Sequence, residues 1–128
     1  MTHQEFVHAF ENGTLEASDF SHEAHLQVAY HYLREHSFLE ACIMMRDGIK
    51  RIAARLGKED LYHETITLAF MSLLAERRET HPQVSWDLFL KANPDLLDRK
   101  VLRHYYTFQV ISSEIARRCF VLPRREEM

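Results

Sequence analysis

The sequence predicts an all-α fold, a single-domain helical bundle of five to seven helices with a central antiparallel hairpin. Two observations favour helices. The chain has only three glycines and three prolines among 128 residues, too few for the many tight turns of a β-sandwich or barrel. Apolar residues also recur at offsets of three and four along most of the chain, which is the spacing of one face of an α-helix.

Capping boxes mark the beginnings of two helices in the first half of the chain. Thr2 with Glu5 begins a short helix that we expect to end at Gly13. Ser37 with Glu40 begins the clearest helix of the sequence, which a second glycine closes. One apolar stripe runs along this helix: Phe38, Ala41, Cys42, Met45, Ile49, Ile52, Ala53 and Leu56.

A further helix lies between these two, after a connector at residues 14–19. Ser18 or Asp19 caps it, and it reaches about His36. Together with the helix that follows, it forms the central antiparallel hairpin, which resembles one tetratricopeptide-type hairpin. Its buried face is expected to consist of Leu26, Ala29, Tyr30 and Leu33.

The second half of the chain predicts one long helix followed by shorter elements. The long helix begins near residues 60–63 and ends at Thr80, and its apolar residues lie nearly all round it, which indicates a central position. Ser85 begins a short helix, and Asn93–Pro94 begins another turn or two. A last helix carries Phe108, Ile111, Ile115 and Cys119 on one side.

We expect residues 1–128 to form one domain, with an N-terminal helix and connector at 1–19, the bundle at 20–122 and a tail at 123–128. Cys42 and Cys119 lie far apart on apolar helical patterns, which predicts buried free thiols. The chain begins without the layout of a signal peptide, and no apolar run approaches the roughly 18 residues of a membrane span. A cytoplasmic protein with no membrane partner is predicted.

Nine histidines in 128 residues raise the question of which ones face the core. At about 100° per residue, His22 falls at the centre of the apolar stripe of its helix, and His25 lies at the edge one turn on. His63 projects in line with the inward face of the long helix. We therefore expect imidazoles from two helices to meet inside the bundle. His3 and His31 fall on polar faces or helix ends and need no function.

The sequence predicts a metal site at His22, His25 and His63. His22 and His25 are three residues apart and project side by side, and His63 would supply a third imidazole from a facing helix. Zinc, iron or manganese suits such nitrogen ligands, and Asp60 or Glu64 is the carboxylate expected to join them. An open position on the metal would activate water or oxygen. Without a metal, no cofactor is predicted.

Tyr62 and Thr67 are close to His63 in the sequence and are expected to fix its ring orientation and tautomer. The separation of His22 and His25 is one residue short of that in zinc proteases, which excludes that class. Two alternatives to a metal stay open. Either the histidines are neutral core residues bonded to tyrosines, Thr67 or backbone carbonyls, or they line a metal-free pocket for a small ligand or proton transfer.

Several segments resemble a family of small bacterial all-helical proteins of unknown function. They are the F-x-H-x-x-H-L segment at 20–26, the Y-H-E-T-x-T segment at 62–67, and residues 93–97, 105–106 and 116–123. The resemblance covers about residues 20–123. It implies that the segments carrying the three histidines belong together, and it supplies no activity or substrate.

Two functions are consistent with these observations. The first is a helical bundle whose histidine-lined interior binds a metal ion or a small ligand, for which the sequence names neither reaction nor substrate. The second is a non-enzymatic protein-interaction module, in which the hairpin offers an apolar groove to a partner helix and the histidines are purely structural. A net charge of −3, with basic residues spread among acidic ones, predicts no nucleic-acid partner. The oligomeric state is left open.

Overall fold

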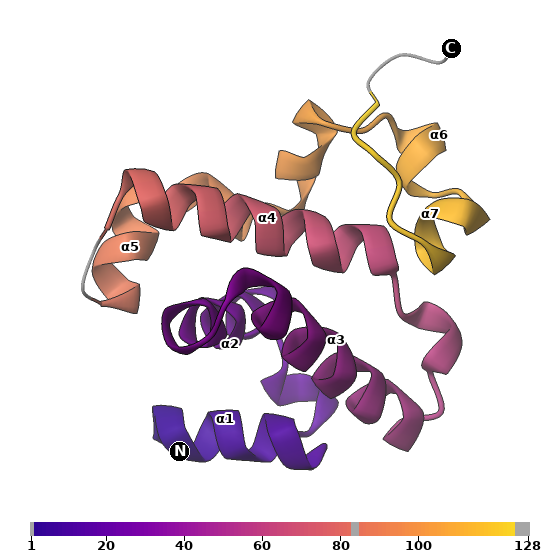
Figure 1. Ribbon diagram of the computed structural model, residues 1–128. Coiled ribbons are helices and arrows are strands. Elements are labelled where there is room, and N and C mark those ends of the chain that lie inside the picture. The colour runs from indigo at the N-terminus through magenta and orange to yellow at the C-terminus, as the bar shows by residue number, and fades with distance from the viewer. Residues whose placement is uncertain (1, 83–84, 125–128) are drawn as a thin grey trace. The chain divides into compact units, whose positions relative to one another are not determined.

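The computed structural model describes residues 2–82 and 85–124, and within them the chain is all-α (Figure 1). These residues hold seven α-helices, four 3-10 helices and one isolated β-bridge between Tyr106 and Arg124. The predicted fold class is confirmed. The chain divides into two compact units, Met1–Tyr62 and His63–Met128. The boundary between them falls inside residues 20–122, the range for which the sequence predicts one bundle.

The first unit consists of helical elements joined by short connections. Its elements are α1 (His3–Asn12), η1 (Ala17–Asp19), α2 (His22–Glu35), α3 (Phe38–Arg55) and η2 (Glu59–Leu61). Two of the predicted helix beginnings are confirmed, because the Thr2 hydroxyl accepts the backbone N–H of Glu5 and Ser37 forms a capping box with Glu40. Gly13 ends α1 in the left-handed conformation, at a φ of 70° that a glycine adopts without strain.

The beginning of α2 differs from its prediction. Ser21 caps the helix by accepting the backbone N–H of Ala24 at 3.2 Å. The predicted caps, Ser18 and Asp19, lie one turn earlier in η1, which is a separate 3-10 turn and leaves the chain extended at Ser21. The end of α2 at Glu35 agrees with the prediction, and a two-residue connection leads directly into α3.

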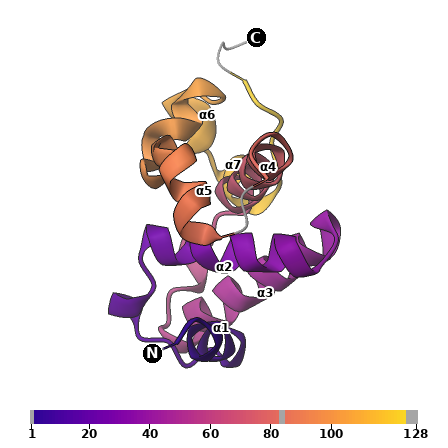
Figure 2. The same ribbon diagram turned by 90° about the vertical axis from the view of Figure 1, so that its left-hand side faces the viewer.

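The core of the first unit forms where α3 packs against both α1 and α2 (Figure 2). Phe10 is completely buried there, and its ring lies over Gly48 so closely that a Cβ atom at Gly48 would come within 2.2 Å of two ring carbons. The ring centroids of Phe20 and Tyr32 lie 5.2 Å and 6.1 Å from that of Phe10. A glycine at position 48 therefore permits close approach of α1 and α3.

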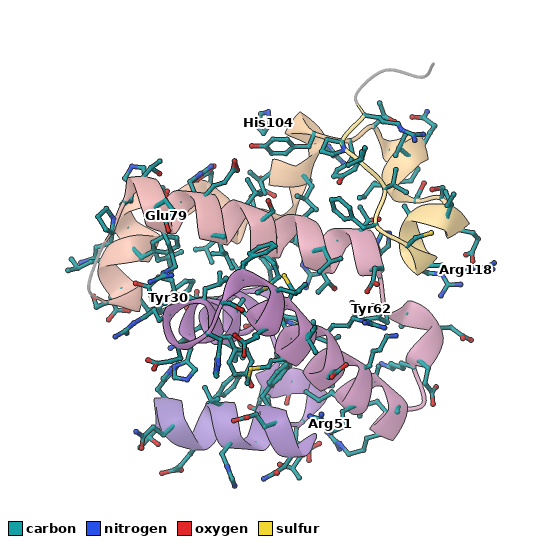
Figure 3. The ribbon with its side chains drawn as sticks, viewed as in Figure 1. Tyr30, Arg51, Tyr62, Glu79, His104 and Arg118 are labelled. Carbon is teal, nitrogen blue, oxygen red and sulfur yellow. The ribbon has the colours of Figure 1, made fainter. Side chains whose placement is uncertain are left out.

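Two arginines of α3 also bind the end of α1 and the loop after it. Arg51 donates to the carbonyl oxygen of Glu11, and Arg55 donates to those of Gly13 and Leu15. Figure 3 shows Arg51 beside the C-terminal end of α1. The carbonyl groups at a helix end lack partners within the helix, and the dipole favours a cation there, so both guanidinium groups stabilise this junction.

The second unit has one long helix and several short ones. Its elements are α4 (Glu64–Thr80), α5 (Trp86–Ala92), η3 (Pro94–Leu97), η4 (Arg99–His104), α6 (Phe108–Ile111) and α7 (Glu114–Arg118). Ser85 caps α5 as predicted. Helix α4 packs against α7, and its buried residues lie nearly all round the helix, in line with the sequence pattern. They are Thr65, Ala69, Phe70, Met71, Leu73 and Leu74.

The single last helix predicted from the sequence is wrong, because the chain breaks into α6 and α7 at Ser112 and Ser113. The Ser112 hydroxyl donates to the Phe108 carbonyl, and the Ser113 hydroxyl caps α7. Serine side chains that bond nearby backbone groups compete with the continuing helix. Cys119 consequently follows α7 in extended backbone and is exposed, whereas it was predicted to be buried. The predicted burial of Cys42 is confirmed.

Polar side chains attach the C-terminal segment to the rest of the second unit. The buried Thr65 hydroxyl donates to the carbonyl of Cys119 at 2.7 Å and accepts the backbone N–H of Val121 at 3.0 Å. The Tyr106 hydroxyl donates to the carbonyl of Val121 at 2.7 Å. Burial raises the pKa of Tyr106, so the phenol keeps the proton that it donates.

A second polar cluster lies near the other end of α4. The guanidinium of Arg77 contacts both carboxylate oxygens of Asp95, at 3.0 Å and 2.8 Å, and donates to the side-chain oxygen of Asn93. Asn93 is buried, and its amide nitrogen donates to the carbonyl of Phe89. Asn93 precedes η3 without capping it through its side chain, which links Phe89 of α5 to Arg77 of α4.

Of the helices in the described residues, none combines the length and the apolar character needed to cross a bilayer. Most of the predicted tail at 123–128 lies outside the described residues, which end at Arg124.

Candidate functional site

His22 and His25 lie on α2, as predicted, and because the helix begins later than predicted they occupy its first turn, where both side chains are only half-buried. The stripe on which they were projected is itself buried at Leu26, Ala29 and Leu33. The two histidines are less buried than the residues of that stripe because they lie at the beginning of the helix, where fewer neighbouring residues cover a side chain. Their predicted position on the helix is correct, and the predicted burial is too great.

The ring of His25 is held by two neighbours. It stacks on Phe20, with ring centroids 3.5 Å apart and planes 18° from parallel. Its Nδ1 lies 2.8 Å from the carbonyl oxygen of Ser21, which accepts only if Nδ1 carries the proton. The neutral ring then has its lone pair on Nε2. A backbone carbonyl that fixes the tautomer in this way is also common behind metal-bound histidines.

His63 begins the second unit and caps α4 instead of lying within it. Its backbone is extended, with φ −129° and ψ 108°, so projection along the helix does not apply to it. The ring Nδ1 accepts the backbone N–H of Ile66 at 3.1 Å, and Nε2 donates to the carbonyl of Ile111 at 2.7 Å. Both nitrogens therefore bond backbone groups of the second unit, and a metal ion would have to replace one of those bonds.

The residues expected to support His63 are arranged differently from the prediction. The Thr67 hydroxyl donates to the backbone carbonyl of His63 at 2.9 Å and does not bond the imidazole. Tyr62 belongs to the first unit, where the Nζ of Lys50 lies 5.1 Å from its ring centroid. Ile66, three residues after His63, is partly exposed.

The proposed carboxylates also belong to different units. Asp60 is exposed in η2 of the first unit, and Glu64 is the first residue of α4 in the second. Within the part of the chain that the structure describes, no three His, Cys, Asp or Glu side chains gather closely enough to hold a metal ion. The three-histidine centre stays a prediction.

A different pair of histidines does meet in the first unit. Nε2 of His3 on α1 lies 3.3 Å from Nδ1 of His31 on α2, and the two ring centroids are 5.0 Å apart. The side-chain amide nitrogen of Gln27 lies 3.3 Å from Nδ1 of His3. One assignment of protons satisfies both contacts: Gln27 donates to His3, and His3 donates to His31. This assignment requires both imidazoles to be neutral.

The surroundings of His31 keep it neutral. Burial lowers its pKa, and the nearby His3 lowers it further, while the carboxylates of Glu35 and Glu11 act in the opposite direction. His3 and His31 were predicted to lie on polar faces or helix ends with no function. A usable signal was present, because His3 falls on the same face of α1 as Val7 and Phe10, one and two turns on.

A patch of large apolar side chains covers the first two turns of α3. Phe38, Leu39 and Ile43, here called the α3 patch, are 47%, 68% and 47% exposed. Leu39 and Ile43 are four residues apart and therefore adjacent on the helix surface. Phe38 was predicted to lie on the buried stripe, but it begins the helix and remains half-exposed.

Most exposed charges near the α3 patch in the sequence are carboxylates: of the four exposed Asp, Glu, Lys and Arg residues at positions 34–47, Arg34 alone is basic. Glu40 and Asp47 are exposed on α3, and Glu35 is exposed at the end of α2. Hydrogen bonds from the Ser37 side chain and backbone lower the pKa of Glu40, so this carboxylate is ionised at neutral pH. The patch therefore combines an apolar centre with neighbouring charges that are mainly acidic.

No protein-family model, curated protein or solved structure matches the chain.

Proposed function

We propose that this protein is a non-enzymatic protein-interaction module, and that the α3 patch binds an amphipathic helix of a partner protein. The observation that carries the proposal is the exposure of Phe38, Leu39 and Ile43 on a helix that also packs against α1 and α2. Large apolar side chains grouped on a surface favour association, because binding removes them from water.

The chemistry of the patch specifies the partner. An apolar centre two turns long accommodates the i, i+3 and i+4 side chains of one helical face. The carboxylates of Glu35, Glu40 and Asp47 would attract lysine or arginine residues beside that face, since complementary charge directs orientation and the rate of encounter. We therefore expect the partner helix to be apolar on one side and basic at its margins.

The shifted pKa values of Cys42 and Asp95 support structural roles for these two residues and not catalytic ones. Burial raises the pKa of the Cys42 thiol to about 11, which leaves it protonated and unreactive at neutral pH. The lowered pKa of Asp95 results mainly from its hydrogen bond with Arg77, within a cluster that joins helical elements. Both shifts have causes in the packing of the fold.

The test uses two synthetic helical peptides of about 18 residues, or five turns, with the same leucine face. One carries lysine at its polar positions and the other glutamate. Binding is measured by fluorescence anisotropy, and the site is located from amide chemical-shift changes. We expect the lysine peptide to bind at α3 and the glutamate peptide to bind at least about tenfold more weakly, a difference of about 1.4 kcal/mol.

Matched substitutions identify the surface. Leu39→Glu should weaken binding of the lysine peptide by about tenfold or more, whereas Leu61→Glu should have no effect, because Leu61 is equally exposed but lies in η2. Lack of binding at millimolar peptide, or binding insensitive to Leu39→Glu, contradicts the proposal. Self-association in light scattering that Leu39→Glu abolishes would assign the patch to a second copy of the chain and also overturn it.

A further inference from the structure

The two imidazoles that meet between α1 and α2 have a geometry that hydrogen bonding alone does not require. Nε2 of His3 and Nδ1 of His31 are 3.3 Å apart. Two nitrogen ligands at about 2.05 Å from one tetrahedral zinc ion, with an angle of about 109° between them, are separated by roughly 3.3 Å. The two nitrogens are therefore already at the separation of neighbouring ligands on one zinc ion.

The group behind His3 is suited to the same role. Gln27 contacts Nδ1 of His3, the ring nitrogen that faces away from His31. A metal on Nε2 moves the proton of His3 to Nδ1, and a half-turn of the Gln27 amide then presents its oxygen as the acceptor. Histidines that bind metals commonly donate their other N–H to such a group, which fixes the ring orientation.

The carboxylates near His31 are also favourable for a cation. The carboxylates of Glu35 and Glu11 are close enough to act on His31 electrostatically, and they would attract a cation. Arg34 opposes this attraction from the exposed side of α2.

We propose that His3 and His31 form a two-imidazole zinc site that links α1 to α2, with water completing the coordination. Two protein ligands are consistent with the described residues, which hold no group of three metal-binding side chains. Because α1 and α2 each supply one ligand, zinc binds the folded unit more tightly than the unfolded chain, in which the two imidazoles are not held together. This inference is independent of the partner-binding function of the α3 patch.

The test titrates ZnCl2 into the untagged full-length protein at pH 7.5. Proton–nitrogen correlation spectra of the imidazoles report which rings bind, and thermal unfolding reports stabilisation. At one equivalent of zinc, we expect shifts at Nε2 of His3 and Nδ1 of His31, and a higher melting temperature. His3→Gln and His31→Gln should each weaken zinc binding by about tenfold or more and remove the thermal shift, since one imidazole remains.

Glutamine keeps a hydrogen-bonding side chain at each position, so circular dichroism of the two variants should show an intact fold. His8→Gln is the matched control, because His8 is an exposed histidine of α1 outside the pair. It should retain both the imidazole shifts and the thermal shift. Zinc that shifts His22 and His25 while the rings of His3 and His31 stay unchanged would overturn the inference, as would stabilisation that survives His31→Gln.

Discussion

The two compact units are both helical and both bury apolar side chains, but their helices differ in length. In the first unit, α1, α2 and α3 are 10, 14 and 18 residues long and pack through large apolar side chains. In the second unit, no described α-helix after α4 exceeds seven residues, and side-chain hydrogen bonds to the backbone recur. Side chains therefore compensate for backbone hydrogen bonds that short helices do not make.

The number of helix ends explains the contrast. Each helix leaves up to four N–H and four carbonyl groups without partners at its ends, whatever its length. In the first unit, Arg51 binds such a group at the end of α1, and Arg55 binds carbonyl groups of the loop that follows. In the second unit, His63, Thr65 and Tyr106 donate to backbone carbonyls of distant segments. A chain of short helices needs more buried polar side chains, and each of them becomes important for stability.

The largest expected effect follows from removing one of these groups. Thr65→Val keeps the shape of the side chain but removes the hydroxyl that bonds both Cys119 and Val121. Leaving two partly or fully buried backbone groups unsatisfied should lower the free energy of unfolding by about 2 to 3 kcal/mol. Urea denaturation measures the loss, and amide hydrogen exchange should show it at residues 119–121.

Thr67→Val on the same helix is the matched control. Its hydroxyl donates only to the His63 carbonyl one turn earlier, and it is half-buried. We expect a change of less than about 0.5 kcal/mol. If Thr65→Val and Thr67→Val lower the free energy of unfolding equally, α4 is sensitive to any substitution. The two hydrogen bonds of Thr65 would then not be important for the stability of the second unit.

The next effect tests the packing of the first unit. Gly48→Ala adds a methyl group that meets the Phe10 ring at 2.2 Å, so α1 and α3 must separate or the ring must move. Overpacking of this kind costs about 1 to 3 kcal/mol, and the better helix propensity of alanine returns about 1 kcal/mol. A net loss of up to about 2 kcal/mol is expected in thermal or urea denaturation.

The double variant Gly48→Ala/Phe10→Leu identifies the cause. Leucine at position 10 removes the ring atoms that meet the new methyl group, so the alanine should cost less in this background than in the wild-type chain. If the cost of the alanine is the same in both backgrounds, the close approach of Phe10 to Gly48 does not determine the packing of α1 on α3.

The same contrast explains which features the sequence predicts. Helices with a capping residue and a long apolar stripe, such as those begun by Thr2 and Ser37, were placed correctly because the relevant interactions are local. The break at Ser112 was not predicted. Serine has only a modest tendency to interrupt a helix, and the hydrogen bond from its hydroxyl to the Phe108 carbonyl, which accompanies the break, is visible only in the structure. Side-chain bonds between distant segments leave no periodic signal in a single sequence.

The candidate sites follow the same rule. The positions of His22 and His25 on α2 were predictable from spacing, whereas the cap position of His63 depends on an extended backbone that no helical projection describes. His3 and His31 are 28 positions apart in the sequence, and their contact depends on the packing of both α1 and α2 against α3. Spacing identifies neighbours within one helix and fails between helices.

The smallest expected effect concerns the exposed polar link between α4 and η3. The hydrogen bond from Arg77 lowers the pKa of Asp95 below its ordinary value of 3.8. The Asp95 carboxylate therefore binds a proton more readily in the unfolded chain than in the folded one. The stability that its ion pair with Arg77 contributes is complete above about pH 4 and is lost as the pH falls through the lowered pKa. Because both side chains are partly exposed, we expect less than about 1 kcal/mol.

Asp95→Asn should consequently be less stable than the wild-type protein at pH 6, and the difference should shrink as the pH is lowered from 4 toward 3. Glu114→Gln on α7 is the matched control. Its carboxylate also pairs with arginines but is fully exposed, so no resolvable change in urea denaturation is expected. If the difference in free energy of unfolding between Asp95→Asn and the wild-type protein stays constant with pH, the new amide disturbs packing near Asn93. The ion pair between Arg77 and Asp95 then does not help to hold η3 on α4.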